Sequence, residues 1–122
     1  MLNWILFAII VGTLGWMGFN YIRVRRAAKV VDNAEFGDMI RQGQLIDLRD
    51  PADFRRKHIL GARNIPSQQL KTSLGAIRKD KTVLLYENSR GQRVMNAAIL
   101  LKKQGYQNIY ILSTGLDGWK GK

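Results

Sequence analysis

Residues 45–66 read LIDLRDPADFRRKHILGARNIP, and this stretch predicts the fold of the chain. It opens with a compact apolar run that ends in the polar Asp47, which indicates a buried strand. Pro51 follows an aspartate, and because proline suits the first position of a helix, a short helix is expected to begin there. A strand, a helix and a further extended segment in immediate succession are typical of α/β domains.

The remaining sequence continues this alternation. The run TVLLY is apolar without interruption, which is typical of a strand buried on both faces of a parallel sheet. The run GQRVMNAAILLKKQG places apolar side chains on one stripe and ends in a glycine, which predicts an amphipathic helix. The expected extended segments cover residues 28–31, 44–48, 62–66, 82–86 and 108–112. The expected helical segments cover residues 33–43, 51–58, 67–77 and 91–105, and Asn33 is the expected N-cap of the first. This order predicts an α/β domain with a mainly parallel sheet.

The composition excludes several kinds of chemistry. The chain has 122 residues, a formal net charge of +11, one histidine and no cysteine. Without cysteine it has no disulfide, no thiolate nucleophile and no cysteine-bound metal. With a single histidine as well, a zinc site is not expected. We therefore expect neither a metal nor another cofactor.

The first residues, MLNWILFAIIVGTLGWMGFNYI, contain no charged side chain. As a helix they would span the hydrocarbon core of a bilayer, which is about 30 Å thick. They predict a transmembrane anchor over residues 1–22, a basic juxtamembrane segment over residues 23–29 and a folded domain over residues 30–122. The alternative is a buried helix of a soluble protein, but the rest of the chain is too short to cover such a helix.

The basic segment RVRRAAK sets the expected orientation and accounts for part of the positive charge. Its cations are Arg23, Arg25, Arg26 and Lys29. Because such charges stay on the cytoplasmic side, we expect a single-pass protein of the cell membrane whose domain faces the cytoplasm. The lipid bilayer is then the partner of residues 1–29. Nucleic acid is not an expected partner, because no aromatic side chains alternate with the basic ones.

A short polar loop, YENSRGQR at residues 86–93, lies between the apolar strand and the amphipathic helix. Backbone N–H groups and the helix dipole favour an anion in such a loop. In parallel sheets, ligands also bind beyond the carboxyl ends of the strands. The candidate anion-binding residues are Glu87, Asn88, Ser89, Arg90, Gly91, Gln92 and Arg93. A protein partner or a small anion is expected there.

The stretch over residues 45–66 resembles the first signature of rhodanese-like domains, and TGLDGW at residues 114–119 is similar to the second, Gly-apolar-x-x-Trp. The residues that match the first signature are Asp47, Arg49, Asp53, Phe54, His58, Ile59, Gly61, Ala62, Asn64, Ile65 and Pro66. The resemblance covers about residues 30–120. It implies a rhodanese-like three-layer fold with a central, mainly parallel sheet flanked by helices, in a family that includes sulfurtransferases.

The resemblance also implies a cysteine directly after the central strand, where the family carries a sulfane sulfur as a persulfide. Aligned from Tyr86, that position is Glu87, whereas aligned backwards from Gly91 and Arg93 it is Asn88. Counted from Glu87, five residues precede Arg93. This is the longer loop of the related cell-cycle phosphatases, which need a cysteine as well. Neither alignment supplies sulfur, so no residue is expected to be the catalytic nucleophile.

Three interpretations of the loop follow. The carboxylate of Glu87 can occupy it, accepting the N–H bonds meant for a ligand and pairing with Arg90 or Arg93. The loop can instead bind an anion through Asn88, Ser89 and the two arginines. In the third interpretation, Glu87 attacks an electrophile in a different reaction.

Two functions are therefore considered for the whole chain. The first is a membrane-anchored, catalytically inactive rhodanese-like domain that serves as a binding or regulatory module at the cytoplasmic face. The alternative is a sulfurtransferase-type enzyme that uses the retained loop with an external thiol or persulfide.

Four residues of the first signature are expected to support the loop. Arg49 and Asp53 are four residues apart at a helix start and are expected to form an ion pair. Asp47, at a strand end, is expected to accept hydrogen bonds from nearby backbone N–H groups. His58 is expected to stabilise a turn by a hydrogen bond.

Overall fold

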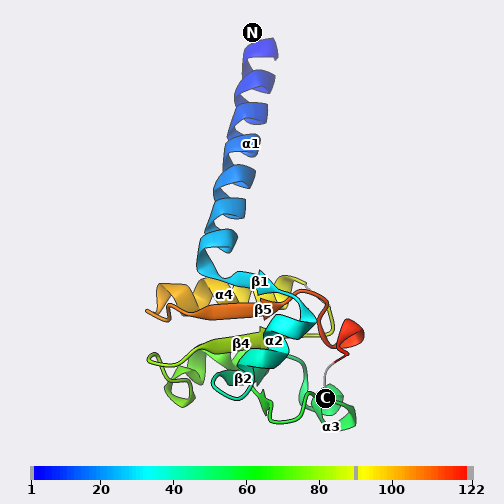
Figure 1. Cartoon of the computed structure of the whole chain (residues 1–122). Helices are drawn as coiled ribbons and strands as arrows, with labels where there is room; N and C mark the ends of the chain where they lie inside the picture. The colour runs from blue at the N-terminus through cyan, green and yellow to red at the C-terminus, as the bar shows by residue number, and fades with distance from the viewer. Residues whose placement is uncertain (1, 90, 121–122) are drawn as a thin grey trace.

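The computed structural model describes residues 2–89 and 91–120, and within them it shows one parallel sheet with helices on both faces (Figure 1). The strands are β1 (Lys29–Val31), β2 (Gln44–Asp47), β3 (Arg63–Asn64), β4 (Val83–Tyr86) and β5 (Ile109–Leu112). Their order is β1-β5-β4-β2-β3, and each neighbouring pair is parallel. The predicted α/β fold with a central parallel sheet is therefore confirmed.

The helices and turns connect these strands. They are α1 (Leu2–Ala27), α2 (Asn33–Met39), α3 (Pro51–Arg56), α4 (Gln92–Lys103) and the 3₁₀ turns η1 (Ser67–Thr72), η2 (Leu74–Ala76) and η3 (Leu116–Gly118). The sequence predicted a helical segment in each of these places except η3. The extended piece expected over residues 62–66 is shorter in the structure, where β3 pairs only through two residues with β2.

The middle strand, β4, separates two hydrophobic cores. All four of its residues are buried. Val83 and Leu85 belong to the core beneath α4, whereas Leu84 and Tyr86 belong to the core beneath α2. Because side chains alternate along a strand, a strand without polar positions requires a covering layer on each face. The continuous apolar run of the sequence therefore dictates the three layers.

The start of α2 differs from the prediction by one residue. Asp32, rather than Asn33, caps the helix, and its Oδ1 accepts a hydrogen bond from the Glu35 N–H at 2.9 Å. Asn33 has another role, since its Nδ2 donates to the Gly118 carbonyl at 2.8 Å and its Oδ1 accepts from the Thr114 hydroxyl at 2.9 Å. Asp and Asn are both preferred at the N-cap, so the local sequence could not decide which of these two residues caps the helix.

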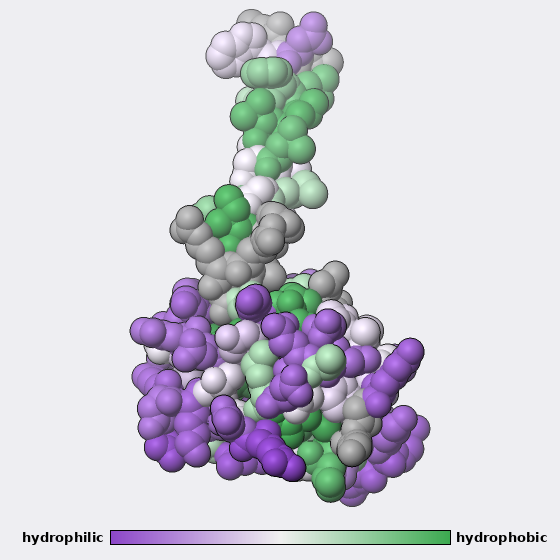
Figure 2. Space-filling model, viewed as in Figure 1, coloured by the Kyte–Doolittle hydropathy of each residue, from purple (hydrophilic) through white to green (hydrophobic). Residues whose placement is uncertain are grey.

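α1 extends away from the sheet, and Figure 2 shows apolar side chains along it above a mostly hydrophilic body. Among the residues that the structure describes, no helix is both long enough and apolar enough to cross a membrane.

The prediction of a transmembrane anchor over residues 1–22, and of a membrane protein with a cytoplasmic domain, is therefore wrong. The bilayer contact of residues 1–29 rested on that prediction. The side chains of Arg23, Arg25 and Arg26, which set the expected orientation, lie outside the described residues.

We predict that Leu101→Ala lowers the free energy of unfolding by about 2 to 5 kcal/mol, because it leaves a cavity in the core beneath α4. Leu101 is fully buried, at 0% exposure. Leu60→Ala is the matched control: Leu60 is 79% exposed, so its loss should change the free energy by less than about 0.5 kcal/mol. Chemical denaturation measures both. Equal effects of the two variants would contradict the assignment of this core.

Candidate functional site

The loop between β4 and α4 lies at the carboxyl edge of the middle strand of the sheet. β4 ends at Tyr86, and α4 begins at Gln92 with the extended Gly91 as its N-cap. The structure describes loop residues 87–89 and Gly91, whereas Arg90 lies outside the described residues. The predicted loop therefore lies where parallel sheets commonly place their ligand sites.

The carboxylate of Glu87 turns back into this loop. Its Oε2 accepts a hydrogen bond from the Val94 N–H, in the first turn of α4, at 2.8 Å. A Cβ added at Gly91 would lie 3.2 Å from the same oxygen, so the carboxylate fills the space beside the helix start. Its negative charge stands where the helix dipole favours an anion. This hydrogen bond agrees with the interpretation in which Glu87 occupies the loop itself. The expected pairing of Glu87 with Arg93 is absent from the described contacts, and Arg90 lies outside the described residues.

The turn after β5 holds the loop from outside. The Leu116 N–H donates to the Glu87 carbonyl at 2.8 Å, and the Asp117 N–H donates to the Asn88 carbonyl at 3.0 Å. Gly115 has a φ of 65°, and a Cβ there would lie 2.4 Å from the Asn88 carbonyl oxygen. Only glycine permits both this conformation and this approach. The glycine of the second signature therefore shapes the loop, a role that sequence reasoning missed.

Arg49 connects the loop to β2 through a buried ion pair. Its Nη2 lies 2.8 Å from Asp47 Oδ2, and its backbone N–H donates to Asp47 Oδ1, also at 2.8 Å. Its Nη1 donates to Asn88 Oδ1 at 3.2 Å, and its Nη2 also donates to the Lys57 carbonyl. Burial alone would lower the pKa of Arg49, but the hydrogen bond and charge of Asp47 outweigh burial and raise it. The guanidinium therefore stays charged and fixes Asn88.

Asp53 makes no described hydrogen bond or ion pair with Arg49. Arg49 pairs with Asp47, whereas the Asp53 carboxylate pairs with Arg56 one turn along α3. The predicted Arg49–Asp53 ion pair is therefore absent from the described contacts. A separation of four residues brings two side chains together only within a helix. Arg49 precedes the helix that begins at Pro51, so this rule does not apply to Arg49 and Asp53.

His58 stands at the end of the same segment and is exposed. Its Nδ1 lies within hydrogen-bond distance of the Phe54 carbonyl, at 2.8 Å, and its ring stacks on that of Phe54 with centroids 4.0 Å apart. This is the turn-stabilising hydrogen bond that the sequence predicted.

Tyr86 closes the inner end of the site and was not singled out by the sequence. It is fully buried, and its hydroxyl accepts a hydrogen bond from the Ile59 N–H at 3.1 Å. Burial raises the pKa of Tyr86 well above its ordinary value, so the phenol stays neutral. A tyrosine at the last position of a buried strand, directly before a polar loop, was the signal available in the sequence.

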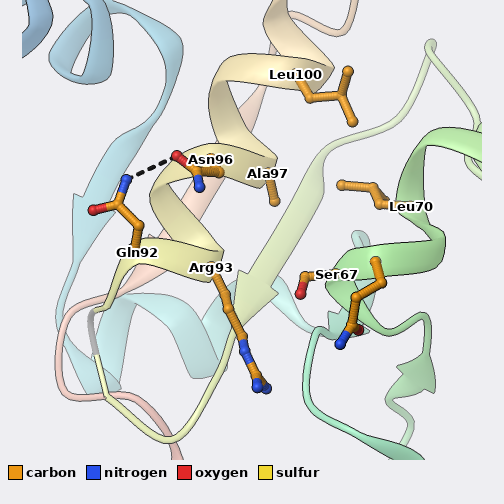
Figure 3. A pocket seen from close by; sticks show the side chains of 8 residues that line it. Ser67, Leu70, Gln92, Arg93, Asn96, Ala97 and Leu100 are labelled. Carbon is orange, nitrogen blue, oxygen red and sulfur yellow. Dashed lines mark hydrogen bonds between the residues drawn. The ribbon is translucent and has the colours of Figure 1, made fainter.

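Arg93 and Gln92 face a groove between α4 and η1 with a volume of about 250 Å³ (Figure 3). Figure 3 shows Arg93 extending away from Asn96, with Ser67 across the groove. Gln92 Nε2 donates to Asn96 Oδ1 at 2.8 Å. Arg93 makes no hydrogen bond or ion pair to another described residue, so its guanidinium is free to meet an anion. Sequence reasoning missed Asn96, although it follows Arg93 by three residues on a helix.

A second cavity, of about 450 Å³, opens beside the loop on the side of α3. Arg49 and Asn88 form part of its wall, and charges of both signs surround it. Its other polar lining residues are Asp53, Arg56, Lys57 and Asp117. Among the described residues, no group of His, Asp and Glu could hold a metal ion.

Comparison with known proteins agrees with this architecture. The model of the Rhodanese-like domain family matches residues 32–122. The chain is 42% identical over 123 residues to the uncharacterised protein YqhL of Bacillus subtilis, covering 100% of this chain and 96% of YqhL. It is 32% identical over 78 residues to the thiosulfate sulfurtransferase GlpE of Tolumonas auensis, covering 62% of this chain and 71% of GlpE.

Among solved structures, the fold is similar to reduced Bacillus anthracis CoADR-RHD, with a TM-score of 0.66 and 28% identity. That match covers 73% of this chain and 16% of the larger protein. The family match over residues 32–122 includes strands β2 to β5 and the β4–α4 loop. The chain belongs to the family of rhodanese-like domains.

Proposed function

We propose that this rhodanese-like domain is catalytically inactive and serves as a binding or regulatory module. The observation that carries the proposal is the hydrogen bond from the Val94 N–H to Glu87 Oε2, at 2.8 Å. It places a carboxylate of the chain itself at the turn where the family is expected to carry sulfur on cysteine. A carboxylate oxygen cannot hold a sulfane sulfur as a persulfide. Its charge also repels thiosulfate.

The surface around the loop supports a binding role. The cavity beside it presents Arg56 and Lys57 together with Asp53 and Asp117. Mixed charges around a concave surface favour a protein partner whose own charges are complementary, because such pairing sets orientation and excludes other partners. The buried ion pair of Arg49 holds this surface in one geometry, which reduces the ordering cost of binding.

A second candidate function is sulfur transfer with an external thiol, and the free guanidinium of Arg93 favours it. In this reaction a thiolate bound beside Arg93 attacks the outer sulfur of thiosulfate. A new sulfur–sulfur bond forms to that thiolate, the bond within thiosulfate breaks, and sulfite leaves with the electron pair. Arg93 would hold the sulfonate end. The relatives named thiosulfate sulfurtransferase make thiosulfate the natural donor to test.

We predict that the wild-type chain neither moves sulfur from thiosulfate to cyanide nor gains a labile sulfur adduct. Glu87→Cys should do both, because the helix start lowers the pKa of a thiol there. Its rate of sulfur transfer should exceed the background rate measured with wild type by about tenfold or more. Asn88→Cys is the matched control: the Asn88 side chain faces Arg49 rather than α4, so a thiol there should remain inactive. Enzyme assay and intact mass spectrometry measure these outcomes. An adduct on wild type would overturn the proposal.

We predict that Glu87→Ala empties the loop. It should lower the free energy of unfolding by about 1 kcal/mol, since an N–H at the helix start loses its acceptor. It should also create thiosulfate binding that wild type lacks, measured by isothermal titration calorimetry. Asp38→Ala removes the same charge from an exposed position near the end of α2 and should do neither. Thiosulfate binding by wild type as tight as by Glu87→Ala would show that the carboxylate does not block the loop.

The second candidate has its own test. With glutathione added, wild type should not accelerate sulfur transfer beyond the rate of glutathione alone if the domain is inactive. The second candidate is supported if wild type accelerates transfer, Arg93→Ala loses this effect and Lys103→Ala keeps it. In that case the domain is an enzyme and not an inactive binding module. Lys103 is the control because it is exposed at the far end of α4, away from the groove.

A further inference from the structure

A basic cavity lies at the opposite edge of the sheet, where β2 and β4 begin. Its volume is about 410 Å³, within the range of about 300 to 1,000 Å³ typical of small-molecule sites. Its wall comes from the segment before β2, from β3, and from the connection between η2 and β4. The charged residues that line it are Arg41, Arg63, Arg78 and Lys81, and no carboxylate is among the described lining residues.

Hydrogen bonds hold these separate segments in place around the cavity. Gln44 clamps the backbone of Arg78: its Nε2 donates to the Arg78 carbonyl at 2.8 Å, and its Oε1 accepts from the Arg78 N–H at 2.7 Å. Arg63 Nη1 donates to the Ala76 carbonyl at 2.7 Å. The connection before β4 is therefore fixed against β2 and β3, and the cations are positioned by the fold rather than by chance on a loose loop.

The positive charge of this cavity is only partly compensated. Arg78 forms an ion pair with Asp80, with the closest atoms 2.6 Å apart. The side chains of Arg41 and Lys81 make no hydrogen bond or ion pair to another described residue, although the charge of Lys81 also acts on the nearby Asp80 carboxylate. The cavity beside the β4–α4 loop is different, because two aspartates there face the cations. Like charges around one cavity repel each other, and an anion placed between them removes this cost.

We propose that this cavity binds a small oligophosphate, that is, a molecule carrying two or more linked phosphate groups. Guanidinium groups match phosphate oxygens with forked hydrogen bonds. Because the four cations stand on separate segments, an anion with several charged groups satisfies more of them than a single oxyanion does. The described lining holds no aromatic side chain, so bases would find nothing to stack on, which argues against a nucleic-acid strand. The proposal does not depend on the β4–α4 loop.

The site is tested by titrating the full chain with tripolyphosphate and measuring the binding by isothermal titration calorimetry. The double variant Arg41→Gln/Lys81→Gln should weaken binding by about tenfold or more, because it removes two lining charges. The control, Lys71→Gln/Lys102→Gln, removes the same total charge from exposed positions elsewhere and should weaken binding by less than about twofold. Since both side chains are exposed and neither makes a described hydrogen bond or ion pair, the melting temperature should not change.

Three results would overturn the proposal: no tripolyphosphate binding by wild type, equal weakening by both double variants, or tighter binding of single-stranded oligothymidine that the cavity variant abolishes. The last result would assign the surface to nucleic acid. If the cavity double variant melts at a lower temperature, Arg41→Gln and Lys81→Gln are measured singly. Each should then weaken tripolyphosphate binding about threefold, and unchanged binding in both would exclude the site.

Discussion

The buried ion pair between Asp47 and Arg49 is the interaction on which the candidate site depends. Asp47 ends β2, and Arg49 reaches from it to the Asn88 side chain in the loop and to the backbone after α3. Both residues are almost completely buried. Removing one partner of such a pair costs about 3 to 5 kcal/mol, because the other charge is left without compensation inside the protein. Electrostatics, as well as the two hydrophobic cores, therefore determines where the loop lies.

The scaffold around the loop and the reactive atom within it are separable features. The strand, the helix start, the glycine turn and the buried ion pair are all formed around Glu87. In the function proposed above, one position differs from what the resemblance to the family implies: a carboxylate oxygen of Glu87 stands where a cysteine sulfur is expected. Fold and function are distinct for this reason: a family's architecture persists through packing, whereas its chemistry resides in a few atoms. Here the start of α4, where the helix dipole favours an anion, donates a hydrogen bond to the side chain of Glu87.

Much of the fold could be predicted because its strongest signals are local. The uninterrupted apolar run of β4 required two covering layers, and Gly105, with a φ of 99°, ends the segment of α4 as its position indicated. The predictions that failed depended on a choice between neighbours or on distant partners. The Asp32 cap differs from the expected one by a single residue. Arg49 found its partner across a strand end rather than along a helix.

The position of the loop that forms the candidate site could be predicted from the sequence, but the directions of its side chains could not. The sequence shows that Glu87 comes directly after the strand. The direction of its carboxylate, toward the Val94 N–H, depends on the path of the backbone and could not be predicted. The sequence also did not predict that Ser67 lines the groove beside Arg93, because η1 comes from a different part of the chain. The N-terminal segment shows the opposite problem: its hydropathy suggested a membrane span that the described helix does not bear out.

The pairing of β1 with β5 brings the first strand of the sheet beside the last. The turn that follows β5 also completes the β4–α4 loop through Leu116 and Asp117. During translation neither contact can form until β5 and the turn after it have left the ribosome. The edge of β4 that awaits β5 stays open during translation, which exposes a hydrophobic strand to other nascent chains. Completion of this domain is therefore a late event, and chaperones that shield unfinished sheets have most to protect in its final stage of synthesis.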